Sequence, residues 1–179
     1  IIIIGAGAMG SAFAVPCLEN KNEVTLVGTH LEDELINNIQ LNNNFHPALN
    51  IELPSNLKVE KYEKLKSILE GDIDIIVAGV SSVGIEWFVK QIKKSYKKNT
   101  PIILLTKGLA IESNELITLS DKIKKLLKDQ GHKDVNISAI KGPCLAAGLA
   151  YKMRTGTVIA NPDIKETEKL KRIISTDYY

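Results

Sequence analysis

The chain has 179 residues, which suits one well-packed α/β domain and is short for two of ordinary size. It is 44% hydrophobic and 25% charged, as in ordinary globular proteins, and a formal charge of +2 gives no indication of a nucleic-acid partner. No apolar run approaches the ~20 residues of a membrane span, and no signal peptide is recognisable. Cys17 and Cys144 form no CxxC pair, so no metal site is predicted and a reducing cytoplasm is expected.

Short apolar runs rich in β-branched residues alternate with helical stretches from the first residue onward. The predicted elements are, in chain order, strand 1–4, helix 8–20, strand 23–27, helix 31–43, strand 58–60, helix 62–69, strand 73–78, helix 83–96, strand 102–106, helix 113–128, strand 135–140, strand 155–160 and helix 164–175. The main strands are apolar almost throughout, as expected for a parallel sheet that is covered on both faces. The alternation therefore predicts a Rossmann-type, doubly wound, mostly parallel sheet with helices on both faces.

Three helical stretches carry more specific expectations. The helix over 113–128 is expected to begin beside Glu112 and Glu115 and to end among lysines, because both arrangements favour the helix dipole. Pro16 lies inside the first helix and should kink it. The lysine-rich stretch 90–98 is interpreted as a solvated helix face, because apolar residues recur beside it with helical period.

A glycine-rich turn follows the first strand. Residues 5–10 read Gly-Ala-Gly-Ala-Met-Gly and match G-x-G-x-x-G between a strand and a helix, the context of a dinucleotide-binding turn. Gly5 allows the tight turn, Gly7 lets the backbone approach a pyrophosphate at the helix start, and Gly10 permits close helix–strand packing. The expected cofactor-binding residues of this turn are Gly5, Gly7, Ala8, Met9 and Gly10.

The end of the second strand leaves the choice between NAD and NADP open. Thr29 and His30 follow this strand and are the cofactor-binding candidates there, in a place where NAD sites usually carry an acidic residue. Glu32 and Asp33 come later and are interpreted as the start of the next helix. No arginine stands ready for a 2′-phosphate, although His30 could contact one. We therefore predict little discrimination between the two coenzymes.

Four further segments, in order and at matching intervals, resemble the NAD(P)-dependent glycerol-3-phosphate dehydrogenases. They cover essentially the whole chain, and the ordered set is far more specific than any single member. The segments are Asn44-Phe45-His46-Pro47 with Leu53-Pro54-Ser55-Asn56-Leu57, Val80-Ser81-Ser82, Thr106-Lys107-Gly108-Leu109, and Lys141-Gly142-Pro143-Cys144-Leu145-Ala146. The later turns lie at the carboxyl ends of predicted parallel strands, where open α/β sheets bind ligands.

The resemblance implies roles for several residues of these turns. Lys107 helps to hold the nicotinamide end and the substrate, and a cation there would polarise a carbonyl group and steady a phosphoester dianion. The other implied contacts are Val80, Ser81 and Ala146 with the cofactor, and Gly142 and Cys144 with the substrate. Cys144 replaces a hydroxyl residue, and Gly148 stands where the family commonly has Glu. With no histidine nearby in sequence, Cys144 is interpreted as a small buried thiol rather than a nucleophile.

The family's reaction is reversible hydride transfer between NAD(P)H and dihydroxyacetone phosphate, which gives sn-glycerol 3-phosphate. By resemblance this chain is the cofactor-binding half, and the proton-transferring lysine belongs to a helical second domain beyond Tyr179. The fragment alone should bind NAD or NADP and turn over poorly, and a homodimer is compatible with the full-length protein. Two alternatives stay open: another ketoacid or hydroxyacid reductase with the same first domain, and a dinucleotide-sensing module without catalysis.

Overall fold

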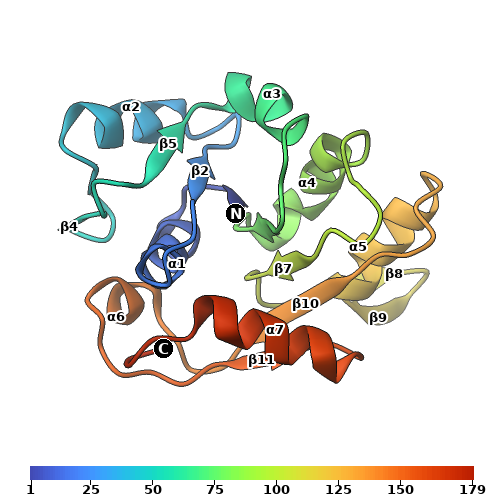
Figure 1. Ribbon diagram of the computed structural model, residues 1–179. Coiled ribbons are helices and arrows are strands. Elements are labelled where there is room, and N and C mark those ends of the chain that lie inside the picture. The colour runs from blue at the N-terminus through green and yellow to red at the C-terminus, as the bar shows by residue number, and fades with distance from the viewer.

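The computed structural model describes residues 1–179, and its centre is a twisted seven-stranded sheet with helices on both faces (Figure 1). The strand order is β11-β10-β7-β6-β1-β2-β5, and every neighbouring pair is parallel except β10 and β11, which are antiparallel. The strands are β1 (Ile2–Ile4), β2 (Thr25–Val27), β5 (Lys58–Glu60), β6 (Ile76–Ala78), β7 (Ile102–Leu104), β10 (Ile137–Lys141) and β11 (Val158–Ala160). The predicted Rossmann-type sheet is thereby confirmed.

The helices divide between the two faces because alternate residues of each strand point to opposite sides. The helices are α1 (Ala8–Glu19), α2 (Asp33–Leu41), α3 (Leu65–Leu69), α4 (Ile85–Ile92), α5 (Leu119–Lys128), α6 (Ala146–Ala150) and α7 (Ile164–Ile174), with 3-10 turns at Tyr62–Lys64 and Ser82–Gly84. One hydrophobic cluster joins Ile3, Leu26 and Val77 to α1, α2, α6 and α7, and the other joins Ile2, Ile4 and Ile76 to α3, α4 and α5.

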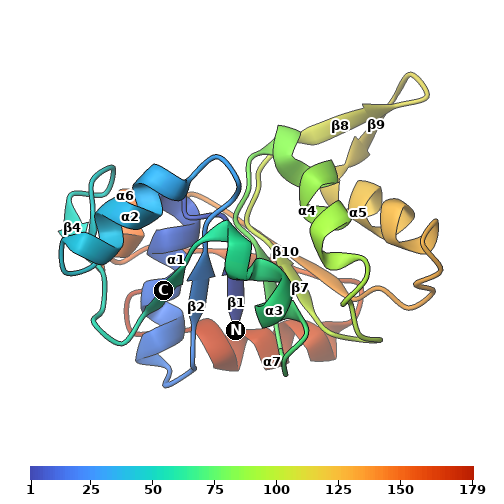
Figure 2. The ribbon, with the colours of Figure 1, turned by 90° about the horizontal axis from the view of Figure 1, so that it is seen from above.

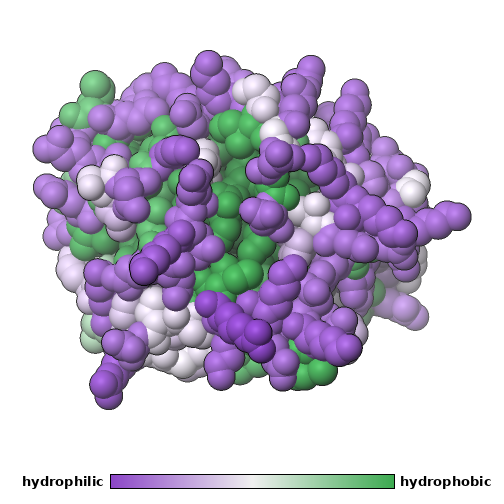
Figure 3. Space-filling view, viewed as in Figure 1, coloured by the Kyte–Doolittle hydropathy of each residue, from purple (hydrophilic) through white to green (hydrophobic).

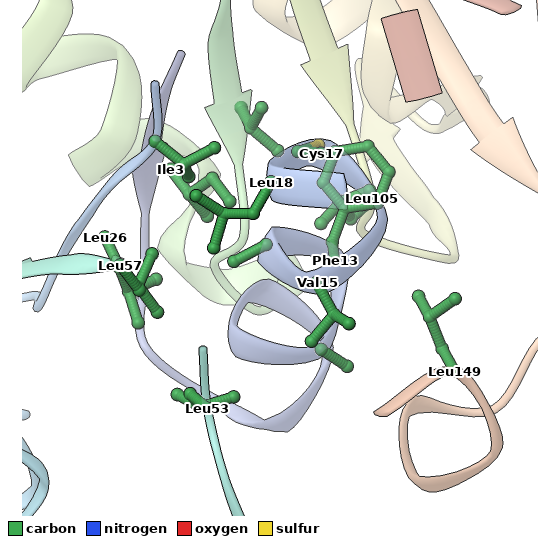
Figure 4. Packing of buried hydrophobic residues seen from close by; sticks show 14 of the residues in the cluster. Ile3, Phe13, Val15, Cys17, Leu18, Leu26, Leu53, Leu57, Leu105 and Leu149 are labelled. Atoms are coloured by element: carbon green, nitrogen blue, oxygen red, sulfur yellow. The ribbon is translucent and has the colours of Figure 1, made fainter. Parts of the chain in front are cut away.

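The packing around α1 anchors the start of the chain in the first cluster. Figure 4 shows Phe13 and Leu18 of α1 among side chains from distant parts of the chain, including Leu105 and Leu149. Helix α1 extends from Ala8 to Glu19 and contains Pro16. Because α1 is fixed in this way, the turn that precedes it is held in a defined position at the end of β1.

The chain reverses its direction across the sheet between β1 and β6. It first adds β2 and β5 on one side of β1, then returns to add β6, β7 and β10 on the other side. Gly79, which follows β6, donates its amide to the carbonyl of Ile4 at 2.9 Å. In open α/β sheets this reversal point creates the crevice that binds ligands at the carboxyl ends of the strands.

One predicted helix begins in the wrong place. Residues 113–118 are not helical: β8 (Leu109–Glu112) and β9 (Glu115–Thr118) form an antiparallel hairpin, and α5 starts only at Leu119. Ser113 and Asn114, at the tip, both have positive φ, which a two-residue hairpin turn requires and a helix excludes. Thr118 caps the helix by accepting the amide of Asp121 at 3.1 Å, so the local start signal lay six residues later. The hairpin projects from the rest of the molecule (Figure 2).

The outer surface follows from the amphipathic helices. Ile85, Phe88, Val89 and Ile92 of α4 are buried and Lys90 is exposed, as predicted for a solvated helix face. The prediction extended the helix too far, because α4 ends at Ile92 and the later lysines of the stretch follow its end. On the face shown in Figure 3, hydrophobic residues gather over the centre and hydrophilic residues cover the margin. None of the helices combines the length and apolar character that crossing a bilayer would require.

Candidate functional site

The glycine-rich turn connects β1 to α1 and presents free backbone amides. Gly5 has φ of +109°, a conformation that residues with a side chain rarely adopt, and a Cβ on Gly10 would lie 2.2 Å from the carbonyl oxygen of Gly5. The amides of Ala8, Met9 and Gly10 donate to no protein acceptor. Three free N–H groups at the positive end of a helix are an anion site, which fits the diphosphate of a dinucleotide.

Ala6, in the middle of this turn, is held from three sides. Its amide donates to Glu32 Oε2 at 3.0 Å, and its carbonyl oxygen accepts from the Ser11 hydroxyl at 3.0 Å and from His46 Nε2 at 3.0 Å. His46 is fully buried, and its Nδ1 accepts the amide of Leu49, so Nε2 carries the proton. The turn is thus fixed by residues up to 40 positions away.

A cleft of about 520 Å³ opens beside the turn, which is within the range of ligand pockets. Its walls come from the ends of β1, β6 and β7 and from the segment after β10. Its lining residues are Gly7, Ala8, Met9, Gly79, Val80, Ser81, Ser82, Leu105, Thr106, Lys107, Cys144, Leu145 and Ala146. The structure therefore brings together eight of the predicted site residues, drawn from the glycine-rich turn and from the three later turns at strand ends that the sequence singled out.

One lysine, Lys107, lines the cleft, and a second, Lys141, bonds to the cleft residue Thr106. Lys107 Nζ donates to the carbonyl oxygen of Gly142 at 3.1 Å, and Lys141 Nζ donates to the carbonyl oxygen of Thr106, so each lysine reaches across to the neighbouring strand end. Burial lowers the pKa of Lys141, and the nearby charge of Lys107 lowers it further. No carboxylate lines the cleft. Such a pair of cations favours an anionic ligand.

The two cysteines differ in their access to the cleft. Cys144 lines it, whereas Cys17 lies inside α1 with none of its surface exposed. Burial raises the pKa of the Cys17 thiol to about 12 and also raises the pKa of the Cys144 thiol. A raised pKa leaves little thiolate at neutral pH, so the interpretation of Cys144 as a structural thiol agrees with its surroundings.

We expect iodoacetamide to modify Cys144 of the folded chain before Cys17. The rate of Cys144 modification should be low at pH 7 and should increase mainly above the ordinary thiol pKa of about 8.5, because the raised pKa of Cys144 shifts formation of the reactive thiolate to higher pH. Saturating NADH should slow the modification of Cys144. Peptide mass spectrometry would measure both rates, with Cys17 as the internal control; equal modification of the two thiols would contradict this placement of the cleft.

His30 and Thr29 lie outside the cleft. His30 packs against Trp87 and Tyr62, with ring centroids 5.1 and 6.0 Å away, in a separate groove between α3 and α4. The amide of Thr29 donates to Glu32 Oε2 at 2.7 Å. The carboxylate of Glu32 therefore lies at the end of β2, although the residues that directly follow this strand in the sequence are not acidic.

Three residues around the site were not predicted to take part: Glu32, His46 and Lys141. Glu32 does precede α2 as expected, but its side chain turns back to the glycine-rich turn. His46 belongs to a segment that was recognised only by resemblance, and nothing local indicates that it reaches Ala6. Lys141 could have been found, because it ends a strand beside Lys107 and directly precedes the Gly-Pro turn.

Comparison with known proteins agrees with this geometry. The family model described as NAD-dependent glycerol-3-phosphate dehydrogenase N-terminus matches residues 1–167. The chain is 33% identical to an NADP(+)-dependent glycerol-3-phosphate dehydrogenase from Archaeoglobus fulgidus over its whole length, and covers 51% of that protein. It is 32% identical to a glycerol-3-phosphate dehydrogenase [NAD(P)+] from Mesoplasma florum, of which it covers 52%. The chain thus spans about half the length of these relatives.

Solved structures show the same fold. The glycerol-3-phosphate dehydrogenase from Coxiella burnetii superimposes with a TM-score of 0.83 at 24% identity, over 99% of this chain and 51% of that one. The enzyme from Plasmodium falciparum gives a TM-score of 0.82 at 23% identity, over 99% of this chain and 50% of the other. Since the family model covers residues 1–167 and the turns that it shares form one cleft, the chain belongs to the family of NAD-dependent glycerol-3-phosphate dehydrogenase N-terminal domains.

Proposed function

We propose that this chain is the coenzyme-binding half of an enzyme that transfers hydride between NAD(P)H and dihydroxyacetone phosphate. The observation that carries this proposal is the position of Lys107 in the cleft, beside the glycine-rich turn and bonded to Gly142. The proposed site consists of the residues expected from the sequence that line or border this cleft. Gly7, Ala8, Met9, Val80, Ser81 and Ala146 face the coenzyme, and Gly142 and Cys144 face the substrate.

The residues present fit a dinucleotide. The free amides of Ala8, Met9 and Gly10 offer donors for a diphosphate, and Gly7, which lacks a side chain, leaves the approach to them open. The cleft continues from this turn past Val80 to Lys107, so one ligand can extend from the anion site to the lysine. When bound, a nicotinamide coenzyme supplies the hydride that is added to C2 of the ketone.

The chain's own residues bind and polarise the substrate. Lys107 can donate to the ketone oxygen, where negative charge grows as the carbonyl group is reduced, and this interaction strengthens toward the transition state. The nearby charge of Lys141 adds to the attraction for the phosphoester dianion. The apolar walls, which include Met9, Val80 and Leu105, limit the water around the reacting atoms.

Reduction also needs a proton for the product hydroxyl, and in this proposal Lys107 polarises the ketone oxygen without supplying that proton. Because the chain spans about half the length of its relatives, we propose that the remaining half of a full-length protein supplies this donor. The 179-residue chain by itself should then bind coenzyme but reduce the ketone poorly.

The test is an assay of the complete gene product with dihydroxyacetone phosphate, offering NADH and NADPH separately and identifying the product by mass spectrometry. We expect oxidation of the coenzyme with formation of glycerol 3-phosphate. Hydroxyacetone, which has the same ketone but no phosphate, is the matched control and should react far more slowly. If the protein reduced a 2-ketoacid in preference to dihydroxyacetone phosphate, it would be a ketoacid reductase instead. If it bound the coenzyme without turning over any substrate, the result would favour a dinucleotide-sensing module.

A further inference from the structure

We infer that Glu32 receives the adenosine ribose of the coenzyme and makes the site select NAD(H) over NADP(H). The inference rests on the proposed function, since it specifies the coenzyme of that same site. It also replaces the expectation of little discrimination, which assumed that Glu32 does nothing more than start a helix. The carboxylate instead joins two strand ends: Oε2 accepts the amide of Ala6, after β1, at 3.0 Å and the amide of Thr29, after β2, at 2.7 Å.

The position of the carboxylate is that of a ribose-binding acid. In dinucleotide-binding folds the ribose 2′-hydroxyl is bound near the end of the second strand, by an acidic residue. No residue of β2 or of the segment from Gly28 to Leu31 is acidic, but the residue before α2 places its carboxylate at this strand end. The two backbone donors fix Oε2, and charge-assisted bonds of this kind are strong. The carboxylate is therefore preorganised.

The second oxygen of Glu32 is free to bind a ligand. Oε1 accepts no hydrogen bond from the protein and lies 3.8 Å from the point where a Cβ on Gly7 would stand. Gly7 is the residue at which the coenzyme approaches the backbone, and it lines the cleft. An unused acceptor beside that residue matches the two donor hydroxyls of a ribose.

The surrounding charges disfavour a 2′-phosphate. Glu32 forms no ion pair, and from Gly28 to Leu41 the chain contains three carboxylates, one histidine and no lysine or arginine. The histidine, His30, is exposed, and its ring contacts the rings of Tyr62 and Trp87, in the groove outside the cleft. The two arginines, Arg154 and Arg172, come after β10, on the other side of the sheet order from β2. The segment after β2 would thus offer a phosphate dianion a fixed negative charge and no lysine or arginine, and the cation at the adjacent strand end is Lys61, which follows β5.

The experiment compares NADH and NADPH binding to the full 179-residue chain by nicotinamide fluorescence. The wild type should bind NADH about 10- to 100-fold more tightly than NADPH, the range expected for a hydrogen bond to a charged acceptor. Glu32→Gln keeps the size of the side chain and should reduce this ratio to about threefold or less, mainly by tightening NADPH. Glu34→Gln is the matched control: it removes the same charge from an exposed position on α2 and should leave the ratio unchanged.

A coenzyme analogue separates the hydroxyl contact from the charge repulsion. NADH that lacks the ribose 2′-hydroxyl should bind the wild type about tenfold more weakly than NADH, and Glu32→Gln should remove most of this difference. Equal affinity of the wild type for NADH and NADPH, or an unchanged ratio in Glu32→Gln, would overturn the inference while leaving the proposed function intact. If neither coenzyme bound the wild type, the proposed function would fall together with it.

Discussion

Replacing Lys107 with alanine in the complete gene product is expected to lower kcat/KM for dihydroxyacetone phosphate by on the order of a hundredfold or more, comparable to the loss of one preorganised donor to a developing oxyanion. The structure gives the reason, because Lys107 Nζ is held at the cleft by the carbonyl oxygen of Gly142, 3.1 Å away. A cation in this position interacts more strongly with the polarised carbonyl group than with the ground state. Steady-state kinetics with NADH and dihydroxyacetone phosphate would measure the effect.

The controls separate charge from position. Lys107→Ala should barely change the free energy of unfolding, because the side chain is exposed and buries little apolar surface. NADH affinity should fall less than turnover, since the glycine-rich turn binds the other end of the coenzyme independently. Lys128→Ala removes the same charge from the exposed last turn of α5 and should keep wild-type kinetics. If the Lys107→Ala enzyme had unchanged kcat/KM, Lys107 would not be part of the active site, and most of the support for dihydroxyacetone phosphate as the substrate would be lost.

Substitutions at two glycines of the same turn are expected to have different effects, one on the stability of the fold and the other on dinucleotide binding. Gly10→Ala should prevent the native turn from forming and destabilise the chain by about 3 kcal/mol or more. Its Cβ would lie 2.2 Å from the Gly5 carbonyl oxygen, and neither atom can move without a shift of the backbone. Gly7→Val should leave the sheet folded, since Gly7 has φ of −62° and its nearest neighbour to a Cβ is 3.8 Å away. It should nevertheless abolish dinucleotide binding, because the side chain would occupy the approach to the free amides.

Urea unfolding followed by circular dichroism, together with calorimetric titration of NADH, would distinguish the two outcomes. Gly7→Val is the folded reference for Gly10→Ala, since both changes add bulk to the same turn. Near-native NADH affinity in Gly7→Val would show that this turn is not the diphosphate site. Wild-type stability in Gly10→Ala would show that the helix and the turn can separate without cost.

Much of the candidate site was predictable because it follows from local rules. A strand that ends at a glycine turn, followed by a helix, places free amides at a known point, and parallel strands bring the turns that follow them to one edge. Lys107, Val80 and Cys144 therefore meet in one cleft although more than 60 positions separate Val80 from Cys144. His30 is a cofactor candidate on the same reasoning, but the structure places its ring outside this cleft, in contact with Tyr62 and Trp87, and no local rule anticipates that contact.

The sequence by itself determined the order of the seven strands of the main sheet and of every helix except α6, because apolar period and turn residues act over only a few positions. The hairpin at Leu109–Thr118 escaped this reasoning, since its charges also suit a helix and only the positive φ of Ser113 and Asn114 distinguishes the two structures. Tertiary structure alone decided how the turn at Ala6 is held. Glu32 and His46 reach it from 26 and 40 positions away, once β1, β2 and the segment after α2 have been packed around α1. Such contacts depend on the three-dimensional path of the chain, and that path is set by burial of the whole core rather than by any local pattern.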